Sequence, residues 1–558
     1  IFFLGLARRG EDPAMRPLAV APTSRGLWLG VGLAVCGGAV VALAALATAA
    51  AAEAKPRSRR RRHDDAKAVA AASAEVAGEG DELAELEDLA AVAEDERRPE
   101  WYADQVRRTI RTAEGHGQPV ASAEGALPGR ARVYVKTQGC AHNSSDSEFM
   151  MGLLQDYGYA FATDVQDSDV VLVNSCTVKN PSQDAATGLV SRARQAGKAV
   201  VLTGCVPTAD TSLVGSLEGV SMLGVTQIDR IVEVVEEALR GNVVRLLGQR
   251  KTMPSLELPK VRRNNLVEII PISGGCLGNC SYCKTKHARG KLNSYPPQAI
   301  IARAKAAAAE GVSEVWLTSE DTGAYGIDIG HDIAALLRGV SDAMPQGVML
   351  KLGMTNPPYM LAHIEAVAEV LNRPNVFGFI HIPVQSGSDS VLQAMVREYT
   401  AADFRRLVDG LRARVPDIMI ATDVIAGFPS ESEEDHRRTM ELVAEYRFPV
   451  LNISQFYPRP GTAAARMRKL PTSAVKRRSG ELTDLFNSYE TFQALSGRQE
   501  RVWFCENDER RGQTVGHTKG YAKVVVDRDD ALLGRSAMVS LGAASKWHVR
   551  GVVKRGGA

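Results

Sequence analysis

The stretch Val267-Glu-Ile-Ile-Pro-Ile-Ser-Gly-Gly-Cys-Leu-Gly-Asn-Cys-Ser-Tyr-Cys283 is a short apolar run followed by a glycine-rich loop that carries three cysteines. The apolar run predicts a buried strand, because β-branched residues dominate it and turn residues follow it. Cys276, Cys280 and Cys283 have the spacing C-x3-C-x2-C. Three thiolates so close together can ligate three irons of a [4Fe-4S] cube and leave the fourth iron to an exogenous ligand. A zinc site would need a fourth ligand, for which His287 is the only nearby candidate.

Strand-like runs alternate with helical patterns beyond this loop. Together with the run at 267–272 they make six βα units, whereas a closed barrel of this type has eight. Six units predict an α/β fold with a partial barrel that is open on one side, which suits a bulky polymer substrate. The other five runs span residues 314–318, 348–352, 378–382, 419–423 and 451–454.

Polar and glycine-rich residues follow these runs, at the end of the strands where barrel enzymes keep their chemistry. Their shared position favours a binding role, although each could also serve an ordinary turn or helix cap. The candidates are Ser319, Glu320 and Asp321, Thr355 and Asn356, Gln385 within 383–387, Asp423 with 427–429, and the stretch 455–461.

Three further cysteines each follow a strand-like run upstream of the loop. The carboxyl ends of parallel strands in an open α/β sheet meet at one crevice, so these thiols should lie together although 36 and 29 residues separate them. They suit an iron–sulfur cluster with one open iron, or a zinc site completed by His142 or His381. Burial of each thiol as a small apolar group is the remaining alternative. The pairs are 133–137 with Cys140, 170–175 with Cys176, and 199–204 with Cys205.

Length and composition limit the class of protein. At roughly 150 residues per domain, 558 residues predict three to four domains. A net charge of +2 neither favours nor excludes a nucleic-acid or acidic partner. An apolar content of 45% and a charged content of 24% exclude a disordered, collagenous or polytopic membrane chain. Eight cysteines are far too few for a disulfide scaffold.

The first 129 residues differ from the rest. Residues 1–14 precede the first methionine, Met15, and are a candidate extension of the gene model, with their translation left open. Residues 26–52 carry no charge and could span a bilayer; basic residues follow them, which places the remaining chain on the cytoplasmic face of a membrane, most simply the endoplasmic reticulum. An organelle-targeting segment or a cytosolic chain are the alternatives. Residues 54–129 are expected to form a disordered linker, since 63–100 hold 13 acids, three bases and no aromatic residue.

Strings of residues between about 130 and 495 resemble the tRNA methylthiotransferases, and among them the eukaryotic and archaeal threonylcarbamoyladenosine tRNA methylthiotransferases. One departure is Ser430 after Gly-Phe-Pro429, where the family usually has glycine. The matching strings are Thr137-Gln-Gly-Cys-Ala-His-Asn-Ser-Ser-Asp146, Asn174-Ser-Cys-Thr-Val-Lys-Asn-Pro181, Thr203-Gly-Cys-Val-Pro207, Gly275-Cys-Leu-Gly-Asn-Cys-Ser-Tyr-Cys-Lys-Thr-Lys-His-Ala-Arg-Gly290, Trp316-Leu-Thr-Ser-Glu-Asp-Thr-Gly-Ala-Tyr-Gly326, Leu352-Gly-Met-Thr-Asn-Pro-Pro-Tyr359, His381-Ile-Pro-Val-Gln-Ser-Gly387 and Gln455-Phe-Tyr-Pro-Arg-Pro-Gly-Thr462.

This resemblance implies three folded regions and two [4Fe-4S] clusters. The regions are an N-terminal open parallel α/β sheet at 130–247, a central partial (βα)6 radical S-adenosylmethionine barrel at 262–495, and a small TRAM-like RNA-binding β-barrel at 498–558. By position, Cys140, Cys176 and Cys205 match the ligands of an auxiliary cluster, and Cys276, Cys280 and Cys283 those of the catalytic radical cluster. Residues expected to bind S-adenosylmethionine are Ser319, Glu320, Thr355, Asn356, Gln385 and Asp423.

The implied reaction adds a methylthio group at C2 of N6-threonylcarbamoyladenosine 37 of tRNA and uses two S-adenosylmethionine molecules per turnover. One donates a methyl group, and the other is cleaved to a 5′-deoxyadenosyl radical. An aromatic C–H bond has no lone pair or leaving group, so a cofactor must supply the difficult chemistry. Alternatives are a methylthiotransferase for isopentenyladenosine tRNA or for a protein side chain, and a non-catalytic iron–sulfur or zinc RNA-binding protein.

Basic residues suggest where tRNA binds. Lys284, Lys286, Arg289 and Lys291 follow the cysteine loop and could reach phosphates, unless they form an ordinary solvated loop. Residues 498–558 hold twelve Lys/Arg and seven Asp/Glu, with short strand-like runs at 521–526 and 537–541. Cys505 in this region is expected to be structural. An electron donor is a further expected partner, and the chain is expected to be a monomer.

Overall fold

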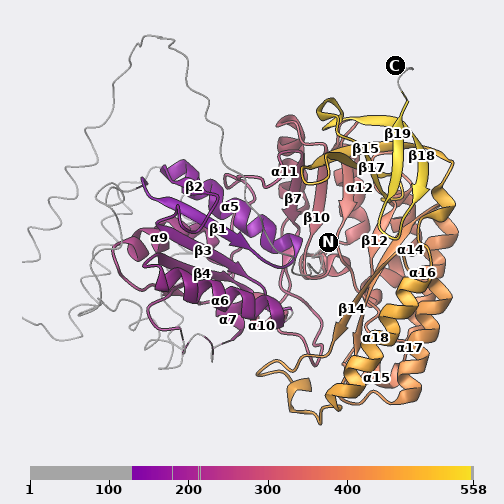
Figure 1. The fold of residues 1–558 in the computed structure, drawn as a ribbon, viewed down its shortest axis with the longest axis horizontal. Coiled ribbons are helices and arrows are strands. Elements are labelled where there is room, and N and C mark those ends of the chain that lie inside the picture. The colour runs from indigo at the N-terminus through magenta and orange to yellow at the C-terminus, as the bar shows by residue number, and fades with distance from the viewer. Residues whose placement is uncertain (1–128, 179, 211–212, 214, 216, 555–558) are drawn as a thin grey trace, which may run out of the picture. The chain divides into compact units, whose positions relative to one another are not determined.

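The computed structural model describes residues 129–178, 180–210, 213, 215 and 217–554 (Figure 1). The expectations for residues 1–128, including the uncharged segment at 26–52, lie outside the described residues. In the part of the chain that the structure describes, no helix is both long enough and apolar enough to cross a membrane.

The N-terminal region is a six-stranded parallel sheet with the order β2-β1-β3-β4-β5-β6. Every residue of β3 and β4 is buried, as expected for central strands that are covered on both faces. The three runs that precede Cys140, Cys176 and Cys205 are thus neighbouring strands. The strands are β1 (Arg132–Thr137), β2 (Ala160–Ala162), β3 (Val170–Ser175), β4 (Ala199–Gly204), β5 (Ser221–Leu223) and β6 (Arg245–Leu246).

Helices cover both faces of this sheet. Alternate residues of a strand point to opposite faces, so Val170 and Leu172 pack with α5 and α9, whereas Val171 and Val173 pack with α6. Two helices begin at the cysteines, because Cys140 is the N-cap of α5 and Cys205 is the first residue of α7. The helices are α5 (Ala141–Tyr157), α6 (Asn180–Gln195), α7 (Cys205–Ala209) and α9 (Ile231–Leu239).

The central region has six parallel strands, as the sequence predicts. They form two three-stranded sheets, β11-β10-β7 and β12-β13-β14. Isolated parallel bridges, Leu350 to Val376 and Met354 to His381, join the two sheets between β11 and β12. The resulting order leaves β7 and β14 at the edges, which is a partial barrel. The strands are β7 (Val267–Pro271), β10 (Glu314–Thr318), β11 (Met349–Leu352), β12 (Phe379–His381), β13 (Met419–Ala426) and β14 (Val450–Gln455).

Helices follow the strands of this partial barrel, and their apolar side chains share one core with α5 and α9 of the N-terminal sheet. The longer helices are α11 (Pro297–Ala309), α12 (Ile333–Ala343), α14 (Ile364–Leu371), α16 (Ala401–Arg414), α17 (Glu433–Tyr446) and α18 (Thr472–Ser488); the short ones are α10 (Thr285–Arg289), α13 (Pro357–Met360) and α15 (Asp389–Ala394).

The C-terminal region is a closed five-stranded barrel with the order β15-β16-β17-β19-β18. Its core side chains, such as Val502 and Phe504, form one cluster with Phe377 and Phe379 of the central region, so the two barrels are packed against each other. The register of β15 shifts between Phe504 and Glu506, which places a bulge at Cys505. The strands are β15 (Gln499–Asp508), β16 (Gln513–Thr518), β17 (Lys523–Asp527), β18 (Ser536–Ala544) and β19 (Val549–Val553).

A buried charged group fixes the connection between the N-terminal sheet and the central barrel. Glu268 of β7 is fully buried and accepts hydrogen bonds from Lys260 Nζ at 2.9 Å, Arg262 Nε at 2.6 Å and Arg303 Nη2 at 3.0 Å. Lys260 Nζ also donates to Ser145 Oγ of α5 at 3.0 Å. The segment that links the two regions is therefore bound to both of them.

The cations around Glu268 control its protonation. Burial alone would raise the pKa of Glu268, but Lys260 and Arg303 outweigh burial and lower this pKa to about 2. A carboxyl whose folded pKa lies below its ordinary value stabilises the fold above that ordinary value of 4.5, and the contribution is lost as the pH falls toward 2.

Replacing Glu268 with glutamine is expected to lower the free energy of unfolding by about 3 kcal/mol at pH 7, because three cations lose their buried counter-charge. Urea unfolding of wild-type and variant chains at pH 7 and at pH 3 measures this loss, which should shrink at the lower pH. Glu369→Gln is the control, since Glu369 pairs with Arg338 at the surface and should change stability by less than about 1 kcal/mol. Equal effects of the two substitutions would contradict this account.

Candidate active site

The loop with Cys276, Cys280 and Cys283 leaves β8 (Ser273–Gly274), which pairs with β9 (Asn293–Ser294). Gly275 has φ +73, and a Cβ there would lie 2.0 Å from the carbonyl oxygen of Lys291, so only glycine fits this turn. A Cβ on Gly278 would lie 3.7 Å from the Sγ atoms of both Cys276 and Cys280, which shows that the loop curls around these two thiols.

Polar groups surround the thiols of this loop. Arg397 Nη1 donates to Cys280 Sγ at 3.0 Å, and the backbone N–H of Thr285 donates to Cys283 Sγ at 3.3 Å. Burial raises the pKa of Cys276 to about 12. Burial also raises the pKa of Cys280, although the Arg397 guanidinium acts in the opposite direction.

The upstream cysteines lie at three adjacent strand ends, and Asn143 of α5 connects them. Gly139 has φ +100, and a Cβ there would lie 2.9 Å from Cys176 Sγ, so the turn that carries Cys140 lies against Cys176. Asn143 Nδ2 donates to the carbonyl oxygens of Gln138 and Ser175, each at 2.9 Å, and Asn143 Oδ1 lies 3.7 Å from Cys205 Sγ. The structure thus brings the three strand ends together.

The three upstream cysteine residues differ in exposure, although burial raises the pKa of the Cys140 thiol too. Cys176 and Cys205 are buried, whereas Cys140 is exposed. Burial raises the pKa of Cys176 to about 11, and it raises the pKa of Cys205 as well. Such thiols stay protonated at neutral pH unless a cation binds them.

Both triplets have a donor set that fits an iron–sulfur cluster. All six cysteines are free thiols, and thiolate is the ligand that iron–sulfur clusters take. In the described chain neither triplet brings its three sulfur atoms within 4.8 Å of one another. A single zinc ion, with bonds of about 2.3 Å to sulfur, would need them closer. The two histidines considered as zinc ligands for the upstream triplet are engaged elsewhere, since His142 Nδ1 lies 2.9 Å from Glu320 Oε1 and His381 Nε2 lies 2.9 Å from Asp423 Oδ1.

A buried ion cluster joins the two triplets. Arg289 of α10 donates from Nη2 to Asp146 Oδ2 at 2.5 Å and to Asn143 Oδ1 at 2.8 Å, and its Nε lies 3.0 Å from Glu320 Oε1. The three charged side chains are only 5–6% exposed. Burial would raise the pKa of Glu320, but His142 and Arg289 outweigh burial and lower it. A second arginine, Arg459, acts electrostatically on both Cys283 and Cys176, so the two triplets face the same region.

Three of the four basic residues expected to bind tRNA contact protein groups, whereas Lys291 is exposed. Lys284 is buried and donates from Nζ to the carbonyl oxygen of Ala209 at 2.6 Å. Lys286 Nζ donates to the carbonyl oxygen of Leu277 at 2.9 Å and to Asn279 Oδ1 at 2.7 Å. Arg289 belongs to the ion cluster. Lys284 and Arg289 therefore hold the cysteine loop against the N-terminal region, whereas Lys286 stabilises the loop itself. Their partners are backbone carbonyl, side-chain amide and carboxylate oxygens.

The expected cofactor-binding residues lie at the strand ends, in two groups. Asp321 accepts hydrogen bonds from its neighbour Asn356 at 2.7 Å (Nδ2) and 3.1 Å (N), and burial raises the pKa of Asp321 to about 6. Arg397 connects this group to the cysteine loop, because it contacts both Asn356 and Cys280. Ser319 and Thr355 are buried beside them.

The second group lies on β12 and β13. Gln385 has φ +66, and its backbone N–H donates to the carbonyl oxygen of Asp423 at 2.8 Å. The Asp423 carboxylate accepts a hydrogen bond from Asn452 at 2.8 Å in addition to its contact with His381. Glu320 belongs to neither group, because the ion cluster occupies its carboxylate.

Sequence reasoning missed Arg397 and Arg459. Arg397 lies in the turn after α15, which no argument from strand ends reaches. Arg459 lies inside the 455–461 stretch, which the sequence places among the strand-end candidates without singling out its arginine.

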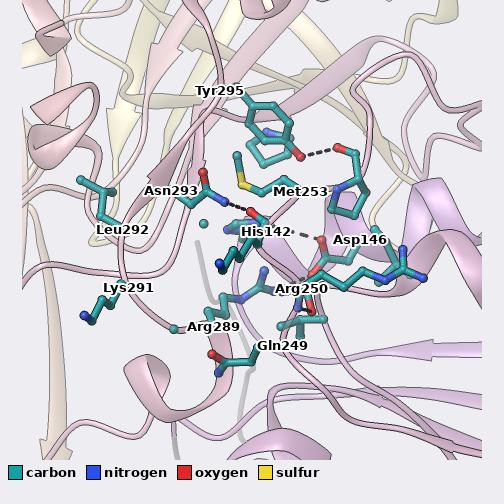
Figure 2. Close-up of a pocket in the computed structure, with 18 of the residues that line it drawn as sticks. His142, Asp146, Gln249, Arg250, Met253, Arg289, Lys291, Leu292, Asn293 and Tyr295 are labelled. Atoms are coloured by element: carbon teal, nitrogen blue, oxygen red, sulfur yellow. Dashed lines mark hydrogen bonds and ion pairs between the residues drawn. The ribbon is translucent and has the colours of Figure 1, made fainter. Parts of the chain in front are cut away.

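A cavity of about 490 Å³ lies between α5, the segment that follows the cysteine loop, and residues 249–254, which belong to the segment that connects the N-terminal sheet to the central barrel (Figure 2). Figure 2 shows His142 and Asp146 of α5 among the lining residues, together with Arg250 and Met253 of the segment that connects the two regions. None of the six cysteines lines this cavity, so it is separate from the two triplets.

Comparisons with known proteins place this geometry in a family context. A model described as "Radical SAM superfamily" matches residues 270–443, and one described as "Uncharacterized protein family UPF0004" matches residues 132–223. The chain is 48% identical over 492 residues to the threonylcarbamoyladenosine tRNA methylthiotransferase of Drosophila pseudoobscura pseudoobscura, with 85% of this chain and 88% of that protein covered. It is also 48% identical over 434 residues to the enzyme of the same name in Homo sapiens, with 77% of this chain and 75% of that protein covered. A solved structure of the radical S-adenosylmethionine methyltransferase TsrM from Kitasatospora setae is 17% identical, covers 60% of this chain and 76% of that one, and gives a TM-score of 0.44.

Replacing Arg289 with methionine is expected to lower the free energy of unfolding by about 3–5 kcal/mol, because Asp146 and Glu320 would remain as buried carboxylates without their cation. Urea unfolding measures this loss. We also expect proteases to cut the linker at 247–262 faster, as the N-terminal sheet loosens from the barrel.

Arg250→Met is the matched control for this experiment. Arg250 also lines the cavity, but its ion pair with Asp229 is at the surface and should contribute less than about 1 kcal/mol. If Arg289→Met is as stable and as protease-resistant as this control, the ion cluster does not hold the two regions together.

Proposed function

The chain belongs to the family of threonylcarbamoyladenosine tRNA methylthiotransferases, and we propose that it adds a methylthio group to C2 of N6-threonylcarbamoyladenosine at position 37 of tRNA. The observation that carries this proposal is the pair of free cysteine triplets on two regions that meet, since Cys205 of the upstream triplet packs with Ala288, five residues after Cys283. One triplet would serve an enzyme that only cleaves S-adenosylmethionine. A second triplet suits the delivery of sulfur.

The six cysteines would hold two [4Fe-4S] clusters. Each triplet supplies three thiolates, which leaves one iron of each cluster without a protein ligand. When bound, the clusters and two S-adenosylmethionine molecules would supply the radical and the methylthio group that an unactivated aromatic carbon requires.

The side chains around the triplets position these groups. Arg397 donates a hydrogen bond to Cys280 Sγ, and such bonds to a ligand sulfur favour the thiolate and tune the metal. Asp321 and Asn356 hold Arg397 in place from the neighbouring strand ends. On the other triplet, Asn143 fixes the turn of Cys140 and the end of β3 relative to each other.

The tRNA would reach the site through the open side of the central barrel. The partial barrel has β7 and β14 as edge strands, so a folded RNA need not enter along the barrel axis. The C-terminal barrel, with its excess of basic residues, supports a TRAM-like role in binding phosphates. We further propose a monomer that receives electrons from a separate donor, and an attachment to the cytoplasmic face of a membrane through residues 26–52, which fits their uncharged composition.

The substrate is tested by mass spectrometry of tRNA nucleosides from a strain that lacks this chain. Loss of the methylthio form of threonylcarbamoyladenosine, with the methylthio form of isopentenyladenosine intact, is the expected result, and the wild-type gene should restore it. Loss of the isopentenyl form instead would assign the other substrate class. If both nucleosides stay unchanged, the proposed function is wrong.

Substitutions in the two triplets should have different effects on the reaction. Anaerobically purified wild-type protein should hold about eight irons per chain, and Cys276→Ala and Cys140→Ala about four each, because each variant loses one cluster. Cys276→Ala should abolish 5′-deoxyadenosine formation. Cys140→Ala should keep it and yet form no methylthio product. A Cys140→Ala protein that cannot cleave S-adenosylmethionine would contradict the division between the triplets.

Arg397→Met is expected to lower the reduction potential of the radical cluster and to reduce S-adenosylmethionine cleavage about 10- to 100-fold, because the thiolate of Cys280 loses a charged donor. Redox titration followed by electron paramagnetic resonance measures the potential without turnover. Arg397→Lys should restore part of the shift. Arg414→Met, which removes an exposed guanidinium from α16, is the control and should leave the potential unchanged.

A further inference from the structure

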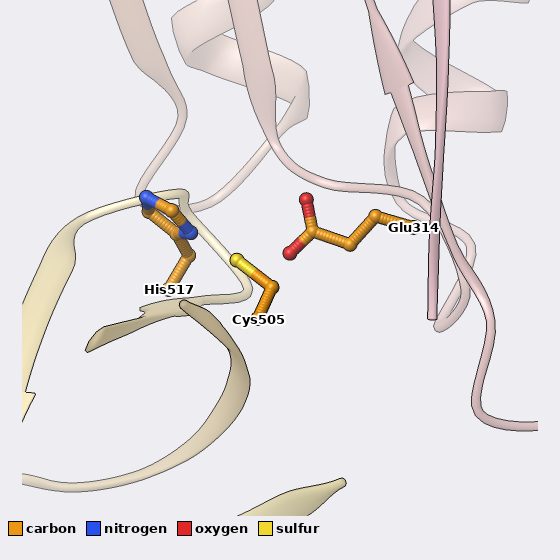
Figure 3. A group of neighbouring side chains, drawn as sticks. All are labelled: Glu314, Cys505 and His517. Carbon is orange, nitrogen blue, oxygen red and sulfur yellow. The ribbon is translucent and has the colours of Figure 1, made fainter. Parts of the chain in front are cut away.

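Three metal-ligand side chains meet far from the cysteine triplets. Glu314 is the first residue of β10, Cys505 lies at the bulge of β15, and His517 lies on β16. One ligand atom from each lies within 4.8 Å of the other two. Figure 3 shows the sulfur of Cys505 between the Glu314 carboxylate and the His517 ring. The group thus joins the central region to the C-terminal barrel.

The polar atoms of this group are buried and incompletely satisfied. Glu314 has no exposed surface; its Oε2 accepts a hydrogen bond from Trp316 Nε1 at 2.7 Å, whereas its Oε1 has no N–H or O–H donor. The Cys505 thiol is the neighbouring donor to this carboxylate. The Nδ1 atom of His517 is buried without a partner. Buried polar groups without a strong partner cost free energy, and two of them at one place indicate that a ligand belongs there.

The donor set selects the kind of ligand. We propose that Glu314, Cys505 and His517 form a zinc site that fastens the C-terminal barrel to the central region. Zinc binds thiolate, imidazole and carboxylate together, and it accepts water as a fourth ligand. Calcium and magnesium prefer oxygen ligands alone, and an iron–sulfur cube needs more thiolates than the single Cys505.

The neighbouring aromatic residues hold these ligands in place. The His517 ring is stacked on Tyr521, with centroids 4.1 Å apart, and Tyr521 packs against Phe377 at 4.8 Å and Phe379 at 4.9 Å.

Two cations, Lys351 and Lys523, act on the site. Lys351 lies over the rings of Trp316 at 4.0 Å and Tyr521 at 4.4 Å, and it interacts electrostatically with Glu314 and Cys505. Glu506 and Lys523, the other charged groups that act on the site, have opposite signs.

The position of the site indicates a structural role. Glu314 begins β10, whereas Ser319 and Glu320 follow the end of the same strand, so the length of the strand separates the zinc site from the reaction site. In barrels the amino end of the strands serves stability and the carboxyl end serves chemistry. The zinc site is therefore independent of the proposed function and of the iron-binding cysteines.

The test measures zinc and iron in holoenzyme that is purified anaerobically without chelators. We expect about one zinc per chain in the wild type, and at least about tenfold less in Cys505→Ser with the iron content unchanged. His548→Gln is the control, since it removes another histidine of the same barrel and should retain zinc.

Cobalt provides a second, spectroscopic readout. Added Co²⁺ should give a thiolate-to-cobalt charge-transfer band in wild-type holoenzyme and in His548→Gln, but not in Cys505→Ser. If Cys505→Ser does not fold, Glu314→Gln takes its place, with at least about tenfold less zinc as the expected result. A wild-type chain that neither contains zinc nor takes up zinc or cobalt would overturn the proposal. Equal zinc in the wild type and the variant would overturn it too, because the metal would then lie elsewhere.

Discussion

The arrangement of the whole site depends on one buried cation, Arg289, held between Asp146 and Glu320. An unpaired charge at such a depth costs several kcal/mol, so none of the three groups can leave without the others. Asp146 belongs to the N-terminal sheet region, whereas Arg289 and Glu320 belong to the central barrel. Their mutual attraction therefore sets how far apart the two cysteine triplets lie.

Helix α5 transmits this constraint to the ligands. It begins at Cys140, it carries His142, Asn143 and Asp146 within its first two turns, and Ser145 donates to the carbonyl oxygen of Ile269 on β7 at 3.0 Å. One helix thus positions a thiol, joins three strand ends and binds the neighbouring barrel. This explains why so many polar residues of α5 are buried, since each has a partner outside the helix.

The sequence was sufficient for the features that depend on local pattern. The apolar runs before the cysteines became neighbouring strands, and six βα units became a six-stranded partial barrel, because strand periodicity and the parallel crossover rule act over short distances. Strands β5 and β6, with three and two residues, are too short to show such a pattern. The directions of single charged side chains could not be predicted. Arg289 resembles a solvent-facing base until Asp146, 143 residues earlier, folds against it. Glu320 likewise follows a barrel strand, where a ligand contact is the natural expectation, and instead pairs with another region of the chain.

The three upstream cysteine residues differ in exposure. Cys176 and Cys205 are buried, and Cys140 is the residue of the three with exposed surface, although burial raises the pKa of its thiol as well. If the proposed cluster forms here, the iron and sulfide that build it would enter most easily past Cys140. Oxygen and peroxide would take the same route, so oxidative damage to such a cluster would begin beside that residue.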